Sequence, residues 1–585
     1  MKKRLIIMII TSIITVGALG GVSYYLYGKG QQIEKENRLR EEQELDLLME
    51  GERKEEYKEK EITMIDCETY SYSPEVVYNT TYSEGRNKEI EKKKKRNVYN
   101  FESPLWQWNL YGTNNLSMYL YFKTTEKVSV RYTVQVADEK IPNFTRTLYN
   151  GAQNNLTREH SYQLIGFVPG QLNYVILEIY GSKGKLLNKK CFGINVPKLE
   201  SGADEKLEVT IGKSEENITN GLYTVFSDKF IWLYDNSGCL RGEIPIAGKT
   251  SQKILYYEDC MFYGLDDNRF VLVNALGQVK DNYSLGKYSQ YADFIYNGYG
   301  QMWILASKNG KKNKSVKDTV IALDMKSKQV TKLFDMENML GKVAKKGKKT
   351  KNSKTFDWIS LNAIEQVDSD SVLLSARELS TIFKIENINS REPRIAYMIG
   401  EDEIWKGVSY KKKLLKKSGQ EKADEERAEE QAESLLDLGQ AEDVFFSQVG
   451  QSYIQYETSK LLSEGQYYLY VWDSNYGEWN TNKKFNWSIW DHIGTVNKKV
   501  DFSYLKKYLV DEKAKTFNLE EEKEIDYTKK NGSMQYYHNH RIDNYGVNKN
   551  YGEYDSNGRL IRSYKHNISG VIRIEKMNLK SFLFY

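Results

Sequence analysis

The feature that most restricts the fold is a weak repeat in the second half of the chain: a strand, an Asp or Asn, a short turn and a second strand. Segments such as IWLYDNSGCLRGEI and YGEYDSNGRLIRSY show it clearly. The turn residues are Asp235, Asn274, Asp324, Asp473, Asp511 and Asp555. Most of their spacings are close to those of four-stranded blades, which bury their faces only against neighbouring blades. The repeat therefore predicts a roughly six-bladed β-propeller over residues 201–585.

The same turn residues have a structural explanation. Asp-x-x-Gly is a tight-turn sequence, in which the aspartate side chain accepts hydrogen bonds from nearby backbone amides. We therefore interpret these residues as parts of hairpins, and not as a metal-binding or acid/base set.

A different strand pattern precedes the repeat. In NLYGTNNLSMYLYFKTTEKVSVRYTVQV, alternate apolar residues place Leu116, Met118, Leu120 and Phe122 on one face. Alternation of this kind is typical of half-buried strands. It predicts a β-sandwich over residues 69–200, so the fold class is all-β, with a sandwich followed by a propeller.

The N-terminus predicts membrane attachment. Leu5 to Tyr27 carry no charge and match the ~20 apolar residues that cross a bilayer. Residues 1–28 are therefore predicted to be one transmembrane anchor in the lipid bilayer, and residues 29–68, rich in charged helix formers, a helical stalk. A signal peptide cleaved after Val16-Gly17-Ala18 is the alternative.

Composition excludes some partners. Lysine plus arginine number 85 against 80 aspartate plus glutamate, which does not indicate a nucleic-acid-binding protein. The four cysteines lack metal-ligand spacing. No metal or other cofactor is predicted, and the sequence has no signal for an oligomeric state. Residues 407–442, basic and then acidic, predict a helical insertion in a blade loop, with a partner-docking arm as the alternative.

One segment resembles a known active site. The run FDWISLNAIEQVDSDSVLLSARELSTIFKI, residues 356–385, contains Asp357, Trp358, Asn362, Ile364, Ser375 and Arg377. These residues resemble the Asp-Trp-x-His-x-Asn-x-Ile and Ser-x-Arg motifs of bacterial PAPS-independent aryl-sulfate sulfotransferases. In this resemblance Ser360 occupies the position of the histidine. The run Asn109 to Thr113 is similar to the start of the family's N-terminal domain.

The resemblance implies the chemistry of sulfuryl transfer, which needs a nucleophile, a proton donor for the leaving phenolate and cations for the sulfuryl oxygens. The family uses three histidines and an arginine. By local motif, Ala292, Ser360 and Ser452 occupy the histidine positions, while Arg377 retains the arginine. Asp293 and Gln451 match the neighbours of the first and third histidines. All three replacements predict a site without its nucleophile.

The leading hypothesis is thus a degenerate member of the family, on the outside of the cell membrane, where the family works. It would bind an aryl sulfate, another small anionic aromatic ligand or a partner at one end of the propeller axis. Arg377 would bind the anion, or instead form a salt bridge within its blade. The supporting residues would be Asp357, Trp358, Asn362, Asp293 and Gln451. The alternatives are an active sulfotransferase with a rearranged nucleophile and a structural surface propeller. A metal role for His538 and His540 is the weakest alternative.

Overall fold

The structure is a computed structural model that describes residues 62–67, 73–312, 314–344, 355–418, 445–478 and 485–585. The predicted anchor, most of the predicted stalk and residues 419–442 of the predicted insertion lie outside these ranges. Among the described residues, no helix has the length and apolar character needed to span a membrane.

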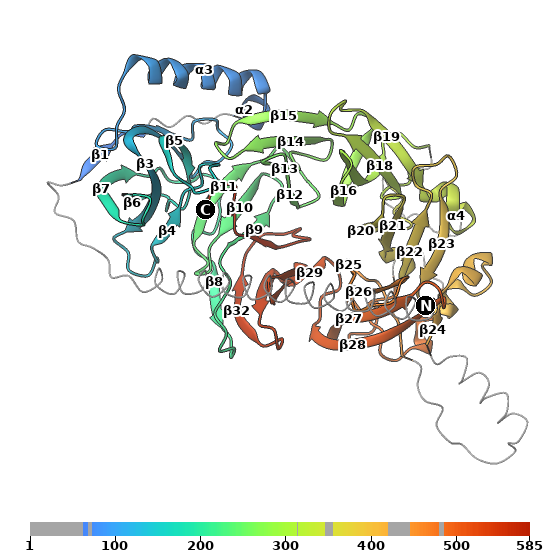
Figure 1. The fold of residues 1–585 in the computed structure, drawn as a ribbon. Helices are drawn as coiled ribbons and strands as arrows, with labels where there is room; N and C mark the ends of the chain where they lie inside the picture. The colour runs from blue at the N-terminus through green and yellow to red at the C-terminus, as the bar shows by residue number, and fades with distance from the viewer. Residues whose placement is uncertain (1–61, 68–72, 313, 345–354, 419–444, 479–484) are drawn as a thin grey trace, which may run out of the picture.

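Six sheets of four or five strands follow one another around a ring and form the predicted six-bladed propeller (Figure 1). The first blade contains β9 (Leu222–Phe226), β10 (Phe230–Tyr234), β11 (Leu240–Pro245) and β33 (Glu575–Met577). The second contains β12 (Ile254–Tyr257), β13 (Cys260–Gly264), β14 (Arg269–Asn274) and β15 (Val279–Ser284). The third contains β16 (Tyr288–Tyr296), β17 (Gln301–Lys308), β18 (Thr319–Asp324) and β19 (Val330–Asp335). The fourth blade contains β20 (Leu361–Asp368), β21 (Ser371–Ala376), β22 (Thr381–Glu386) and β23 (Arg394–Ile399). The fifth contains β24 (Lys416–Lys417), β25 (Tyr453–Glu457), β26 (Gln466–Asp473), β27 (Phe502–Asp511) and β28 (Thr516–Asp526). The sixth contains β8 (Glu208–Ile211), β29 (Gly532–Tyr537), β30 (His540–Tyr545), β31 (Asn550–Tyr554) and β32 (Leu560–Lys565).

Both ends of the propeller sequence close the ring. β33, near the C-terminus, pairs antiparallel with β9 and completes the first blade, while β8 pairs with β32 and extends the last blade. Two distant parts of the chain therefore share one sheet at each side of the closure. This arrangement removes the open edges that an unclosed series of blades would leave.

The repeat identified most of the equivalent hairpins. Asp235, Asn274, Asp324, Asp511 and Asp555 each begin the turn between the last two strands of a blade. Asp235 shows the mechanism, because its Oδ1 accepts from the amides of Ser237 and Cys239 at 2.8 and 2.9 Å. Asp473 was assigned to this set incorrectly. It ends β26 within the fifth blade, whereas the fourth blade turns at Asn387, which has a φ of 58°.

The N-terminal domain is a sandwich built around one long strand. The nineteen-residue β3 (Met118–Val136) pairs with β2 and β5 through its first half and with β4 and β6 through its second half. It therefore belongs to both layers. Its direct partners are β2 (Leu105–Trp108), β4 (Phe144–Thr147), β5 (Thr157–Leu164) and β6 (Leu172–Tyr180). The sheet continues from β6 to β7 (Leu186–Asn195) and then to β1 (Thr63–Ile65).

Two local predictions for this half of the chain are wrong. β1 lies inside the range assigned to the helical stalk, and it pairs parallel with β7. The range assigned to the sandwich contains two helices, α2 (Pro74–Val77) and α3 (Thr80–Arg96). Asn79 caps α3 by accepting a hydrogen bond from the amide of Thr81. Four basic residues in the last turn of α3 interact favourably with the negative end of the helix dipole.

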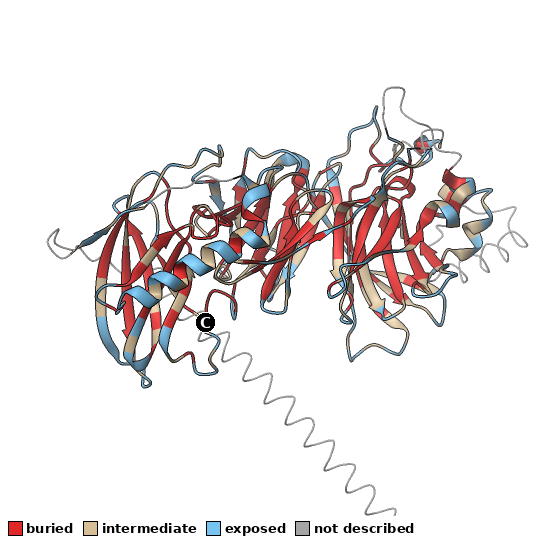
Figure 2. Ribbon diagram, turned by 90° about the horizontal axis from the view of Figure 1, so that it is seen from above, coloured by how far each residue is buried: buried red, intermediate tan, exposed pale blue. Residues whose placement is uncertain are grey.

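The sandwich packs directly on the first two blades. Arg241 of β11 pairs with Asp235 at 2.6 Å and donates to the carbonyl of Gly166 in the sandwich at 3.0 Å. The hydroxyls of Tyr78 and Tyr263 lie 3.0 Å apart across the same boundary. One hydrophobic core continues through both domains, and Figure 2 shows the buried strands on either side with α3 exposed on the surface.

Short helices occupy several connections: α4 (Met336–Ala344), η2 (Arg377–Leu379), η3 (Asp402–Trp405), η4 (Ser409–Lys413), η5 (Trp487–Ile489) and η6 (Gly546–Asn548). In the described part of the predicted insertion, η4 is a single 3₁₀ segment, and β24 pairs with the outer strand β28. The insertion therefore begins beside the outer strand of the fourth blade, where Leu414 bridges Met398 of β23, and then reaches the outer edge of the fifth blade.

Candidate functional site

A polar cavity of about 360 Å³, including the part open to solvent, lies where the inner strands of three blades meet. Its walls come from β16, β20, β25 and the loops that precede β29 and β33. They are formed by Tyr291, Ala292, Asn362, Arg377, Ser452, Tyr453, Asn531, Ile572 and Arg573. Four residues predicted from sequence thus lie in one cavity, although 160 positions separate the first from the last. The tyrosines, Asn531, Ile572 and Arg573 were missed.

Arg377 is the charged centre of the part predicted from sequence. It begins η2 directly after β21 and is only 9% exposed. Its Nη2 donates to Ser360 Oγ at 3.0 Å and lies 3.4 Å from Glu378 Oε1. Burial lowers the pKa of the guanidinium, but Tyr291, Glu378 and Asp357 more than offset this, so the pKa is raised. Arg377 therefore remains a cation at any physiological pH.

Two of the three presumed histidine positions have an uncommon backbone conformation. Ala292 has a φ of 60° and Ser360 a φ of 50°, both in the left-handed region. Histidine is enriched there among non-glycine residues, so the backbone is compatible with the family's residue at both positions. Ser360 is fully buried and reaches the cavity only through Arg377.

Ser452 occupies the third position but has no base beside it among the described residues. Its Oγ donates to the carbonyl of Gly532 in the sixth blade at 2.7 Å. A carbonyl cannot accept the proton in the way that a histidine or carboxylate would. The Ser452 hydroxyl therefore connects two blades and is not activated for attack.

Asn362 lines the cavity, and Gln451 lies beneath it. Asn362 Nδ2 donates to the carbonyl of Gln451 at 2.9 Å, and Gln451 Nε2 donates to that of Thr381 at 3.0 Å. Gln451 is fully buried and does not line the cavity. The oxygens Asn362 Oδ1, Gln451 Oε1 and Ser375 Oγ have no hydrogen-bond partner among the described residues. Buried polar atoms of this kind are uncommon and need a water or a ligand.

Asp293 positions Arg573, the second arginine of the cavity wall. Its Oδ1 pairs with Arg573 at 2.9 Å and Lys253 at 3.1 Å, and its Oδ2 accepts from the amide of Ile364 at 3.2 Å. Burial raises the pKa of this carboxyl, but Arg573 and Lys253 lower it to about 2. Asp293 is therefore an ionised support for Arg573 and is not a general base.

Asp357 and Trp358 lie outside the cavity wall. Asp357 pairs with Lys317 at 2.7 Å, and the Lys317 ammonium lies 4.2 Å from the centre of the Tyr291 ring. Trp358 is fully buried, and its Nε1 donates to Asp318 Oδ2 at 3.3 Å. Asp357 is thus linked to the cavity through Lys317 and Tyr291, whereas the hydrogen bond of Trp358 leads to Asp318, which does not line the cavity.

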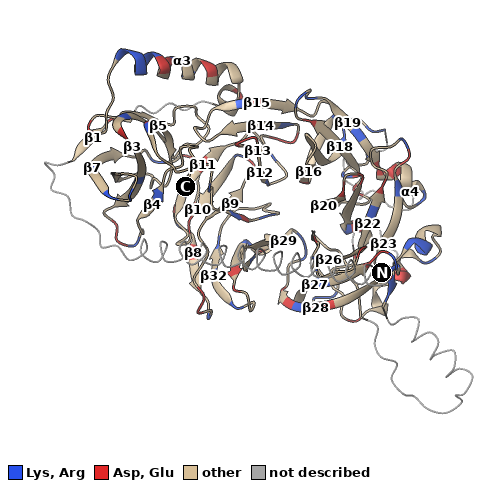
Figure 3. Ribbon diagram, viewed as in Figure 1, with Lys and Arg blue, Asp and Glu red and all other residues tan. Residues whose placement is uncertain are grey.

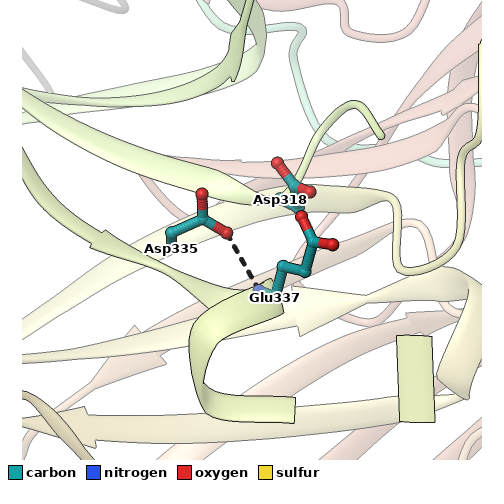
Figure 4. A group of neighbouring side chains, drawn as sticks. All are labelled: Asp318, Asp335 and Glu337. Atoms are coloured by element: carbon teal, nitrogen blue, oxygen red, sulfur yellow. Dashed lines mark hydrogen bonds between the residues drawn. The ribbon is translucent and has the colours of Figure 1, made fainter. Parts of the chain in front are cut away.

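A group of three carboxylates in the third blade has the geometry of a metal site, shown in Figure 4: Asp318, Asp335 and Glu337. The ammonium of Lys311 lies 2.8 Å from Asp318, 2.9 Å from Asp335 and 3.6 Å from Glu337. Lys311 therefore supplies the positive charge that a metal ion would bring. His540 is likewise engaged on both ring nitrogens, by Glu553 at 2.7 Å and Glu216 at 3.3 Å.

Two family models match the sequence. The model described as Arylsulfotransferase (ASST) matches residues 208–579, more than half of the chain, and the Arylsulfotransferase Ig-like domain matches residues 105–197. These ranges correspond to the propeller and to most of the sandwich. No curated protein matches the chain.

Solved structures give only distant likenesses. An auxiliary nutrient binding protein from Bacteroides thetaiotaomicron is 10% identical over 77% of this chain and 94% of its own, with a TM-score of 0.30. BamB from Moraxella catarrhalis is 8% identical over 76% and 98%, with a TM-score of 0.26. A putative 6-phosphogluconolactonase from Bacteroides fragilis is 10% identical over 64% and 99%, with a TM-score of 0.29. Likenesses this weak carry no functional argument.

Proposed function

Because this chain belongs to the arylsulfotransferase family, we propose that it is a degenerate member that binds a small anionic aromatic ligand in the axial cavity and does not transfer sulfuryl groups. One observation carries the proposal. The cavity contains a buried cation, Arg377, whereas Ala292, Ser360 and Ser452 stand at the three positions where the motifs imply histidine.

The chemistry of transfer explains why this matters. Attack on an aryl sulfate breaks the bond between sulfur and the phenolic oxygen, so it needs a nucleophile that can hold the sulfuryl group and an acid that protonates the phenolate. Ala292 can supply neither, and the Ser452 hydroxyl donates a hydrogen bond to a carbonyl, which cannot remove its proton. The cations Arg377 and Arg573 can still stabilise an anion, which is a binding function.

The cavity also suits the aromatic part of such a ligand. Tyr291 and Tyr453 contribute rings to its walls, and Ile572 adds an apolar contact. Asn362 Oδ1, which has no partner among the described residues, can accept a hydrogen bond from a ligand hydroxyl. Cation, rings and amide together favour a phenolic sulfate or a similar anion over a purely apolar ligand.

Binding is tested with 4-nitrophenyl sulfate. The compound should raise the melting temperature of the wild type, and Arg377→Ala should abolish the rise. Arg394→Ala is the matched control, because this arginine lies on the outer strand of the same blade with 67% of its side chain exposed. A rise retained in Arg377→Ala would contradict the role of this residue. No rise in the wild type would favour the structural alternative.

Catalysis is tested with the same donor and a phenol acceptor. Each general acid–base group typically contributes ~10²–10⁴-fold, so the wild type should show no transfer above background. Ala292→His, Ser360→His and Ser452→His together should introduce transfer that Arg377→Ala removes. Robust transfer by the wild type would contradict the degenerate function and favour the rearranged-nucleophile alternative.

We also place the protein in the cell membrane, with residues 1–28 as its anchor and the body outside the cytoplasm. The support is the uncharged run Leu5 to Tyr27 and the extracytoplasmic work of the family. Protease added to intact cells should digest the body. A native N-terminus that begins after Ala18 would contradict the anchor.

A further inference from the structure

We propose that one end of the sandwich is a docking surface for anionic lipid headgroups, so that the anchored protein lies against the bilayer. We name this surface the basic end and define it by six exposed cations and three exposed apolar residues. The cations are Lys92, Lys95, Arg96, Lys127, Lys183 and Lys185, and the apolar residues are Val98, Leu186 and Leu187.

Backbone pairing brings these residues together from three separate segments. The end of α3 leads to Asn100, which bridges Lys123 of β3, so α3 ends beside the irregular part of β3 between Lys123 and Val128, which contains Lys127. Ser129 of β3 pairs with Tyr180 of β6, which places the β6–β7 turn at the same end. Asn188 of β7 donates to Glu102 at 2.9 Å and joins the turn to the segment after α3. Figure 3 shows the basic end of α3 on the side of the sandwich away from the propeller.

Among the described residues, ion pairs do not neutralise the charge of the basic end. Glu91 pairs with Lys94 at 2.8 Å and Glu102 with Lys190 at 3.3 Å, which leaves the exposed Glu126, next to Lys127 in sequence, as one carboxylate against six cations. None of the six cations that define the surface forms an ion pair with a described residue. The helix dipole explains a preference for Lys95 and Arg96 in the last turn of α3, but it does not explain Lys183 and Lys185, which lie in a hairpin turn.

The apolar residues distinguish a membrane from a purely ionic partner. Val98 is 90% exposed, and Leu186 and Leu187 are each 43% exposed, beside the lysines. Exposed apolar side chains among lysines and arginines are typical of surfaces that contact headgroups and the start of the acyl region.

The direction of the chain supports the same partner. β1 runs parallel to β7 from Thr63, so the chain enters it from the side of the β6–β7 turn. In the sequence, residues 28–62 separate the uncharged run Leu5 to Tyr27 from Thr63. The chain therefore reaches the described part of the sandwich from the side of the basic end. This inference rests on the proposed anchor, and it is independent of ligand binding in the cavity.

The test uses the full chain in lipid nanodiscs. Val98→Cys carries an environment-sensitive fluorophore, and Val496→Cys is the matched control, because Val496 is 69% exposed and lies in the fifth blade. The label at position 98 should shift to the blue in discs of phosphatidylcholine with phosphatidylglycerol, and not in discs of phosphatidylcholine alone. High salt should reverse the shift. The label at position 496 should not respond.

A charge variant completes the test. Each basic residue near an anionic surface strengthens association about fivefold, so Lys95→Gln, Arg96→Gln, Lys183→Gln and Lys185→Gln together should weaken docking by about two to three orders of magnitude. Equal emission in both lipids, or a shift that survives the four substitutions, would overturn the proposal. Failure of the chain to enter the discs would instead overturn the anchor.

Discussion

Two buried polar regions of the propeller differ in how completely their atoms are paired. At the ring closure, Glu553 receives hydrogen bonds on both oxygens, from Lys576 at 2.7 Å, from His540 at 2.7 Å and from Tyr223 at 2.5 Å. In the cavity, Asn362 Oδ1 has no partner among the described residues. A network whose polar atoms are all hydrogen-bonded stabilises the fold, whereas a buried acceptor without a partner can receive a hydrogen bond from a ligand.

The closure network joins the two ends of the propeller sequence. Glu553 belongs to β31 in the sixth blade, and Lys576 belongs to β33 in the first. Both side chains are fully buried. Burial alone would raise the pKa of Glu553, but Lys576 and His540 lower it well below its usual value. The Glu553 carboxylate therefore stays ionised well below neutral pH.

The largest expected effect breaks this network. Glu553→Ala leaves the Lys576 ammonium buried without its counter-charge, which should lower the free energy of unfolding by about 3–5 kcal/mol. Urea denaturation measures it. Glu553→Leu with Lys576→Met should recover most of the loss, because apolar residues replace both charges. A loss below about 1 kcal/mol in Glu553→Ala would show that the network does not hold the ring closed.

The carboxylate group of the third blade offers a second, smaller test. Lys311→Ala leaves Asp318, Asp335 and Glu337 without their cation, and the expected loss is about 3 kcal/mol. Oxygen ligands from three carboxylates suit Ca²⁺, so added Ca²⁺ should raise the melting temperature of the variant. It should leave that of the wild type unchanged. A wild-type response to Ca²⁺ would mean that Lys311 does not exclude the ion.

Two carboxyls of inner strands, Asp293 of β16 and Glu365 of β20, should make stability depend on pH in two windows. Asp293 has its pKa lowered from 3.8 to about 2, so its stabilising contribution is present above pH 4 and is lost as the pH falls toward 2. Burial raises the pKa of Glu365 from 4.5 to about 7, so the folded state becomes less stable as the pH rises from 4.5 through 7. Glu365→Gln should remove the second change in denaturation curves, and an unchanged slope would contradict this assignment.

The smallest effect on stability belongs to the cavity. Asn362→Ala removes one hydrogen bond to the carbonyl of Gln451, which is worth about 1 kcal/mol or less. It should nevertheless reduce the rise in melting temperature that an aryl sulfate produces. The free energy of unfolding and the ligand-induced rise in melting temperature, measured together, show whether Asn362 acts in binding or in stability. A large stability loss in Asn362→Ala would place it in the same class as Glu553.

The sequence predicted the parts of this fold that repeat. Asp235, Asn274, Asp324, Asp511 and Asp555 identified five hairpins, because a turn that needs side-chain acceptors restricts the residue type locally. Asn387 was missed, since the fourth blade turns through a longer and less regular segment. α3 was missed because only Ser83 and Ile90 are buried, so it has no apolar stripe.

The candidate site was predictable where its residues belong to compact motifs. Ser360, Asn362 and Arg377 lie within one segment that resembles the family, and Ala292 and Ser452 have shorter motifs of their own. Arg573 was missed because only the ring closure brings it to Asp293, 280 positions away in sequence. An arginine within the apolar pattern of VIRIEKM was the one available signal.

The return of β33 to the first blade has a consequence for the order of events during synthesis. Arg573 and Ile572 immediately precede β33, and they complete the wall of the cavity. A ribosome that has not yet released the last residues therefore carries five whole blades and one incomplete blade, without a finished cavity. Pairing across such a sequence separation is slow, since the intervening chain must first be ordered. On the proposed function, ligand binding therefore cannot precede the pairing of β33 with β9.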